Sequence, residues 1–217
     1  MRIERTLDRG SVHRWADTCP GETLLRGTVY IATEGGGVPD GELELIQRSL
    51  NGDLEAWGEI VSRYKEAAFG IAVAILRNRA DAEDAVQDAF VRAYERLDRY
   101  DLSRKFSTWM FTVTANVAKN ALRRRRRDPL PKEVWAEDPA RMVWQEEMEQ
   151  IVREAVWGLP EPYRAPLVLR YWHDLPLEEI GDVLGLRLGT VKTRLHRARA
   201  LVRAELAARG VIRDAVG

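Results

Sequence analysis

One stretch of the sequence combines the residue types that contact nucleic acids. From Arg104 to Arg127 the chain reads RKFSTWMFTVTANVAKNALRRRRR, with eight basic residues, three aromatic residues and no acidic residue. Lys and Arg neutralise phosphates whatever the base sequence, and aromatic rings stack on bases that have left the duplex. The stretch therefore predicts a surface for a nucleic-acid strand whose bases are unstacked.

The candidate contacts in this stretch are rings, side-chain amides that can read a base edge, and cations for phosphates. They are Phe106, Trp109, Asn116, Lys119, Asn120, Arg123, Arg124, Arg125, Arg126 and Arg127. An arginine run of this length exceeds what the C-terminal dipole of a helix requires. Two alternatives stay open: the rings recur at a helical spacing that also fits a buried core, and an outward Asn can simply be solvated.

A second basic segment has the pattern of a helix-turn-helix. A short helix expected at Leu177 to Leu184 is followed by Gly185, whose positive φ ends a helix tightly. The next helix turns Val191, Leu195 and either Leu201 or Val202 inward, and its outer face suits the DNA major groove. The candidate DNA contacts are Arg187, Thr190, Lys192, Thr193, Arg194, His196 and Arg197. The alternative is a surface helix that is basic without binding DNA.

An acidic segment precedes both basic ones in the chain. Asp81 to Asp101 contains seven acidic and three basic residues. We expect a helix here with Asp81 as its N-cap. Asp84, Gln87 and Asp88 would lie on its outer face. Such a face is either solvated or a surface for a basic partner.

The elements around these segments predict an all-α fold of two small helical domains joined by a flexible linker. The domains are expected at residues 40–127 and 143–210, with the second helical unit starting near Val143. The linker is 128–142, because 128–140 holds three prolines and four acidic residues. Asp53 follows an Asn-Gly turn and should cap the next helix. Residues 1–39 read as a flexible extension, in which Thr28 to Ala32 could form one short strand.

Composition excludes several classes of protein. The formal net charge of zero conceals the segregation of charge described above. The single Cys19 excludes an internal disulfide, and the three histidines are scattered, so no metal site and no cofactor are expected. No Gly-rich phosphate loop or nucleophile pair points to an enzyme. No apolar run approaches a membrane span, so a cytoplasmic protein without membrane insertion is expected.

Taken together, these motifs resemble a bacterial sigma factor of the sigma-70 family, in the compact extracytoplasmic-function (ECF) group. The resemblance covers Glu42 to Arg209. DAEDAVQDAFVRAYERLDRYD resembles the region 2 helix that docks on the polymerase β′ clamp, which implies contacts from Asp84, Gln87, Asp88 and Arg92. FSTWMFTVTANVAKNALRRRRR resembles the segment that melts and captures the promoter −10 element. The segment from Leu159 to Val202 resembles region 4, which reads the −35 element.

The resemblance also implies partners and shows departures from the family pattern. Implied partners are RNA polymerase core, through the β′ clamp and β flap, promoter DNA, and an anti-sigma factor. Pro176 and Arg187 stand where the family usually has capping residues, and Arg187 is expected to contact a phosphate instead. Thr112 replaces a common basic residue. The alternative is a two-domain repressor or activator that binds closed duplex through the helix-turn-helix.

Overall fold

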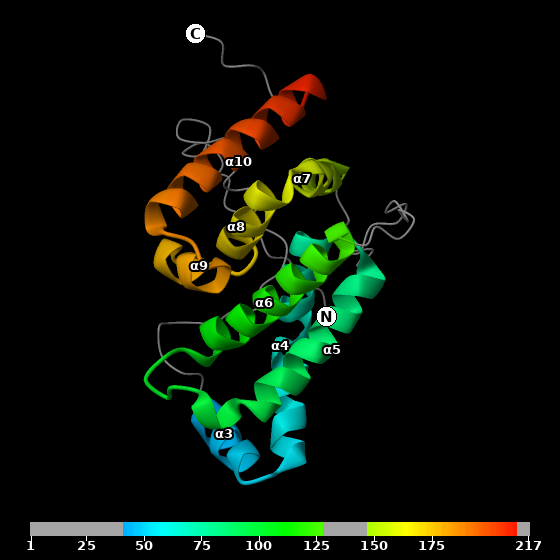
Figure 1. Cartoon of the computed structure of the whole chain (residues 1–217). Helices are drawn as coiled ribbons and strands as arrows, with labels where there is room; N and C mark the ends of the chain where they lie inside the picture. The colour runs from blue at the N-terminus through cyan, green and yellow to red at the C-terminus, as the bar shows by residue number, and fades with distance from the viewer. Residues whose placement is uncertain (1–40, 128–146, 212–217) are drawn as a thin grey trace, which may run out of the picture.

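The structure is a computed structural model that describes residues 41–127 and 147–211, and these residues form helices joined by short turns. The first helical unit contains α3 (Glu42–Leu50), α4 (Leu54–Leu76), α5 (Arg79–Glu95), the 3-10 helix η1 (Leu97–Arg99) and α6 (Phe106–Arg127) (Figure 1). The second contains α7 (Glu147–Gly158), α8 (Glu161–Tyr171), α9 (Leu177–Leu184) and α10 (Leu188–Ala208). The predicted all-α class is confirmed.

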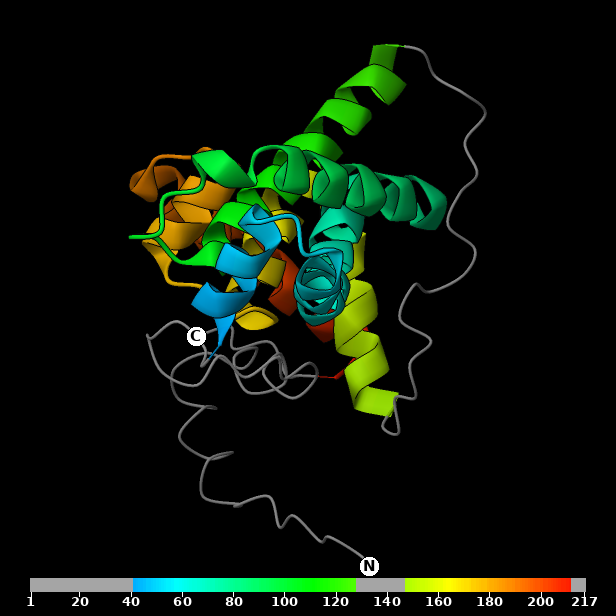
Figure 2. The same cartoon turned by 90° about the horizontal axis from the view of Figure 1, so that it is seen from below.

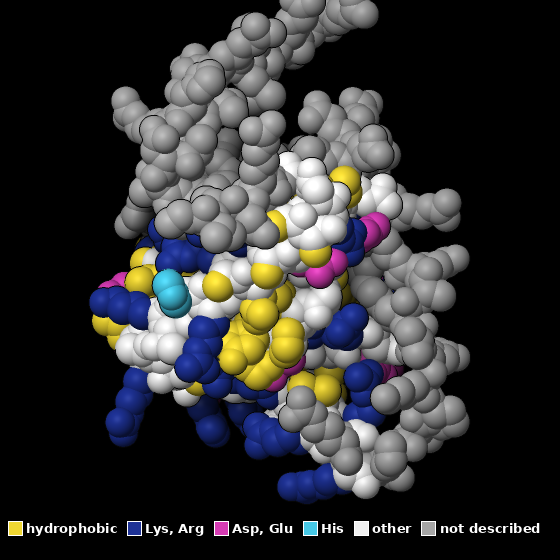
Figure 3. Space-filling view, turned by 90° about the horizontal axis from the view of Figure 1, so that it is seen from above, with side chains coloured by type: hydrophobic (Ala, Val, Ile, Leu, Met, Phe, Trp, Pro, Cys, Tyr) yellow, Lys and Arg dark blue, Asp and Glu magenta, His cyan; other side chains and the backbone are white. Residues whose placement is uncertain are grey.

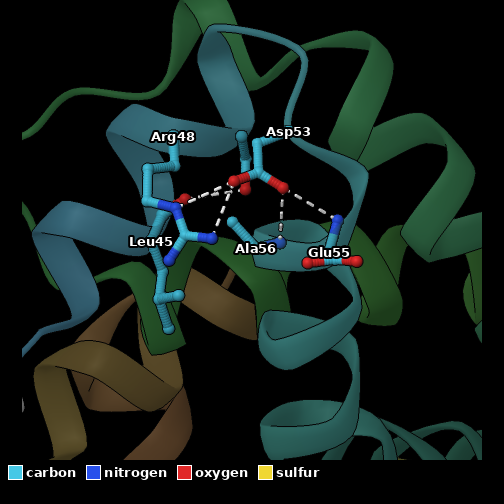
Figure 4. A network of polar contacts seen from close by, with 6 residues as sticks. Leu45, Arg48, Asp53, Glu55 and Ala56 are labelled. Atoms are coloured by element: carbon cyan, nitrogen blue, oxygen red, sulfur yellow. Dashed lines mark hydrogen bonds and ion pairs between the residues drawn. The ribbon is translucent and has the colours of Figure 1, made fainter.

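The turn between α3 and α4 is held by the capping residue that the sequence predicts. The Asp53 carboxylate accepts hydrogen bonds from the backbone N–H groups of Glu55 (3.0 Å) and Ala56 (3.1 Å). Its other oxygen accepts from Arg48 Nε at 2.8 Å (Figure 4). The backbone donors and Arg48 favour the ionised form and lower the pKa of Asp53. Asp53 thus satisfies two otherwise unpaired N–H groups at the start of α4.

The predicted cap of α5 is wrong by three residues. Asn78, not Asp81, is the N-cap, and its side-chain oxygen accepts from the Asp81 N–H at 2.8 Å. Asp81 lies in the first helical turn instead. Arg77 ends α4 with a positive φ of 53°, so the chain reverses within two residues and α5 begins earlier than expected.

A ring cluster fixes α6 against the rest of the first unit. The Phe106 ring lies 5.5 Å from the Tyr64 ring and 5.2 Å from the Tyr100 ring, measured between centroids. The Tyr64 hydroxyl donates to the buried Glu42 carboxylate. The pKa of Tyr64 is raised, mainly by burial. These contacts anchor the N-terminal turn of α6 and therefore orient the whole helix.

The second unit contains the predicted helix-turn-helix. Gly185 ends α9 with a φ of 64°, and α10 begins three residues later. Gly181 permits the tight turn, since a Cβ there would lie 2.8 Å from the Leu186 carbonyl oxygen. Val202 is buried whereas Leu201 is 43% exposed, which decides between the two inward candidates. Neither Pro176 nor Arg187 makes a side-chain cap, as the sequence departures suggested.

Several sequence predictions lie outside the described residues. These are the extension at 1–39 with its short strand, the linker at 128–142 and a start of the second unit near Val143. The helical units themselves pack against each other, α4 on α8 and α6 on α9 (Figure 1). Within the described ranges, no helix has both the length and the apolar character that a membrane span requires.

Candidate nucleic-acid interface

One side of α6 presents a line of side chains that suits a nucleic-acid strand. Spacings of three and four residues place these side chains along one stripe of the helix. We call it the strand stripe; it consists of Trp109, Val113, Asn116, Asn120, Arg123 and Arg127. The two asparagines and the two arginines are exposed, whereas Trp109 and Val113 are half-buried. The C-terminal end of α6 projects beyond the neighbouring helices, so cations there are open to a ligand (Figure 2).

The structure places the two candidate rings differently. Phe106 is only 1% exposed and lies inside the ring cluster, so it takes the core role that the sequence left open. Trp109 is half-buried, with its centroid 5.2 Å from that of Tyr100 and 5.4 Å from that of Phe106. Of the two, only Trp109 keeps accessible surface for stacking on a base.

The arginine run is divided between two faces of the helix. Arg123, Arg124, Arg125 and Arg127 are exposed, and the side chain of Arg126 lies outside the described residues. Arg125 points back toward the first unit, where it pairs with Asp81 at 2.7 Å and donates to the Leu76 carbonyl at 3.2 Å. It therefore satisfies a carbonyl at the end of α4 and is not directed toward the strand stripe.

Lys119 lies beside the strand stripe but is engaged by the second unit. Its ammonium group donates to the Leu184 carbonyl at the end of α9, at 3.1 Å. Burial lowers the pKa of Lys119, and the positive charge of Arg123 lowers it further. In this arrangement Lys119 is not free to bind a phosphate.

The outer face of α10 forms the second candidate surface. Six of the seven predicted contacts are exposed and Arg194 is half-buried; the exposed ones are Arg187, Thr190, Lys192, Thr193, His196 and Arg197. The Thr193 hydroxyl donates to the Gly189 carbonyl at 2.9 Å, which leaves its oxygen able to accept. Figure 3, which views the molecule from above, shows many Lys and Arg side chains at the visible surface and few acidic ones. The outer face of α10 can approach phosphates and base edges.

The outer face of α5 forms a third surface of different character. Asp84 and Gln87 are exposed, and Asp88 accepts from Arg92 Nε at 2.8 Å, which orients both side chains. Val91 lies on the same side and is 57% exposed, a large apolar surface in the middle of an acidic stripe. Val91 was not among the contacts predicted from the sequence. It follows Asp84, Gln87 and Asp88 by seven, four and three residues, so helical spacing places it on the same face as they are.

Comparison with known proteins accounts for these surfaces together. Residues 60–128 match the model for sigma-70 region 2, and residues 149–202 match a model for sigma-70 region 4. The chain is 34% identical over 176 residues to the ECF RNA polymerase sigma factor SigW of Bacillus subtilis, covering 74% of this chain and 94% of SigW. It is 31% identical over 173 residues to the ECF RNA polymerase sigma-E factor of Escherichia coli K12, covering 73% of this chain and 90% of that protein.

Solved structures agree on the fold. The structure of CnrH in complex with the cytosolic domain of CnrY is similar, with a TM-score of 0.59, 28% identity, and coverage of 78% of this chain and 99% of that one. The sigma factor RpoE of Bartonella quintana, solved with the anti-sigma factor NepR, has a TM-score of 0.60 at 24% identity, with coverage of 69% and 95%. The chain belongs to the sigma-70 family of RNA polymerase sigma factors, in its ECF group.

Proposed function

We propose a division of labour in which each of the three surfaces has one task during promoter recognition. The outer face of α5 docks on RNA polymerase core, at the β′ clamp. The outer face of α10 holds the duplex of the −35 element. The strand stripe of α6 captures the non-template strand of the −10 element after the duplex opens. No covalent chemistry is needed from this chain.

The segregation of these surfaces is the observation that carries the proposal. The exposed amides and arginines of the strand stripe follow a half-buried Trp109 along one helix, as a stacking and phosphate-binding surface requires. The acidic face of α5 belongs to the same unit but has the opposite charge, so it favours a basic protein partner and disfavours DNA. The residues assigned to each surface are proposals.

A base that leaves the duplex loses stacking and pairing worth a few kcal/mol. Stacking on Trp109 and hydrogen bonds to Asn116 and Asn120 would offset this loss only when the strand is single. The stripe therefore favours the opened promoter over the closed one, which is how a protein without an active site can promote melting.

A protein inhibitor of the anti-sigma type is the fourth proposed partner. CnrH was solved in complex with the cytosolic domain of CnrY, and the present chain is 28% identical to CnrH. This likeness supports a protein partner for the present chain. On the polymerase side, the β flap is the proposed contact of the second unit, as the β′ clamp is of the first.

Transcription with purified bacterial polymerase core on a genomic promoter library tests the proposal. We expect selective transcripts that share two upstream elements.

Asp84→Arg should weaken core binding by about 10- to 100-fold, because it sets a cation against a basic partner. Glu66→Arg, an equal charge change at an exposed position of α4, is the matched control. Tight binding to closed duplex by the chain alone, without core binding, would instead establish a repressor or activator.

A further inference from the structure

A carboxylate of the second unit is bound to the start of α6. Glu179, in the first turn of α9, uses both oxygens: one accepts from Lys105 Nζ at 2.7 Å and the other from Thr108 Oγ1 at 2.6 Å. The Glu179 side chain is 18% exposed, whereas that of Lys105 is 52% exposed. A partly buried anion thus holds one cation and one hydroxyl, which is the donor set that also binds a phosphate oxygen.

The other end of α9 is held by the same helix. The Leu184 carbonyl, one of the last four of α9, accepts from Lys119. Such carbonyls lack partners within the helix, and a cation beside them also complements the helix dipole. Lys105, Thr108 and Lys119 therefore fix both ends of α9 along α6.

The position of α9 matters for the strand stripe. On the α6 helix, Thr108 and Lys119 lie next to the line of Trp109, Asn116 and Asn120, turned by about one residue's rotation. Helix α9 consequently contacts the side of α6 next to the strand stripe, through Thr108 and Lys119. Its last carbonyl also occupies the ammonium of Lys119, which precedes Asn120 by one residue.

The geometry points to Glu179 as an internal substitute for a DNA phosphate. It keeps Lys105 and Thr108, at the start of α6 beside the strand stripe, occupied while the two helical units are closed on each other. This inference rests on the proposed function of α6. It predicts that closure and capture of a strand compete for Thr108 and Lys119. A strand must displace α9 before Lys119 and Thr108 become available.

Packing elsewhere between the units holds the closed arrangement in place. Arg164 of α8 donates to the Ala74 carbonyl near the end of α4 at 2.6 Å and also to the Leu159 carbonyl of its own unit. The His173 ring lies 5.6 Å from the Phe111 ring, and a Cβ at Gly70 would lie 3.5 Å from its Nε2. These contacts lie away from the strand stripe, so they close the units without covering it. Of the contacts between the two units described above, the α6–α9 contact is the one that lies beside the strand stripe.

The neighbouring residue provides a matched control. Glu178 lies in the same first turn of α9 and is exposed. Glu178→Gln removes the same charge from the same helical turn as Glu179→Gln. A general electrostatic effect on DNA would be the same for both variants, whereas release of α9 is expected from Glu179→Gln alone.

The experiment uses the full chain with two labels that report the distance between the units. In a Cys19→Ser background, Ala80→Cys and Ala204→Cys place labels on exposed positions of α5 and α10. Interspin distances are measured without DNA, and binding of a dye-labelled mixed-sequence single strand is measured in parallel. We expect Glu179→Gln to raise the open-to-closed ratio and the affinity for the strand by roughly 2- to 10-fold. Glu178→Gln should match the parent protein in both.

A charge swap provides a second test that does not depend on DNA. Lys105→Glu should lengthen the distance between the labels, and adding Glu179→Lys should restore the short distance. Equal behaviour of Glu179→Gln and Glu178→Gln would overturn the inference, as would opening of the units without any gain in strand affinity. Promoter-directed transcription by the parent protein reports on the proposed function separately, because its absence would overturn that function whatever the distances show.

Discussion

At the scale of single residues, neighbouring arginines of α6 have different surroundings. Arg123 is exposed on the strand stripe, whereas Arg125 pairs with Asp81 and bonds to the end of α4. Arg123 and Arg125 are two residues apart, which corresponds to a rotation of about 200° around the helix axis. The two side chains therefore point to nearly opposite sides of α6. Their contributions to DNA binding should differ accordingly.

Arg123→Ala should reduce the slope of log affinity against log salt by about one for binding of promoter DNA by the holoenzyme, because one phosphate contact is lost. Arg125→Ala should leave that slope unchanged and lower the free energy of unfolding by roughly 0.5 to 1.5 kcal/mol through its lost ion pair and hydrogen bond. Salt titrations of binding and urea denaturation measure the two effects. Equal slopes for the two variants would contradict the assignment of the stripe.

At the scale of elements, α10 begins without a side-chain cap. Arg187 occupies the N-cap position with extended backbone angles and makes no cap hydrogen bond. Its exposed guanidinium instead lies at a helix N-terminus, where the free N–H groups attract a phosphate. Helix α10 thus lacks a stabilising side-chain cap and has a cation at the expected DNA surface in its place.

Arg187→Ser should separate these two effects. Serine at this position supplies the missing cap and should raise the free energy of unfolding by roughly 0.5 to 1 kcal/mol. The same change should reduce the salt slope of promoter binding by about one. Thermal or urea unfolding and salt titration measure them independently, with Arg187→Ala as the control that removes the cation without adding a cap. An unchanged salt slope would exclude a phosphate contact by Arg187.

At the scale of the whole molecule, a histidine lies where the two units meet. His173 follows α8, packs on Phe111 of α6 and lies near Gly70 of α4, neither of which is charged. Burial lowers the pKa of His173 from 6.5 to about 4. The closed form therefore favours the neutral ring, and an open form in which the ring meets water would bind a proton more readily.

Closure should consequently depend on pH. The contribution of neutral His173 is fully present above about pH 6.5 and is lost as pH falls toward 4, by at most about tenfold in the closed-to-open ratio for each pH unit. Distances between labels on the two units, measured from pH 7.5 to 5, should lengthen as the pH falls. His173→Phe, which keeps an uncharged ring, should flatten this profile. A profile that persists in His173→Phe would assign the effect to other groups.

Much of the fold follows from local patterns in the sequence. The apolar periodicity predicts helices, Asp53 and Gly185 mark a start and an end, and the charge segments indicate which helices bear surfaces. The α5 cap was misplaced because Asn78 and Asp81 have equally good capping chemistry. The choice between them depends on where Arg77 reverses the chain, which the side chains alone do not reveal.

What the sequence by itself determined is the class of protein, the helices and the residue types on each surface, because these depend on composition and on spacings of three and four. Only the tertiary structure decided that Phe106 lies in the core, that Arg125 pairs with Asp81 and that Glu179 binds Lys105 and Thr108. Residues 71 positions apart in the chain meet in the last contact. Such contacts depend on how whole helices pack, and no local spacing encodes them.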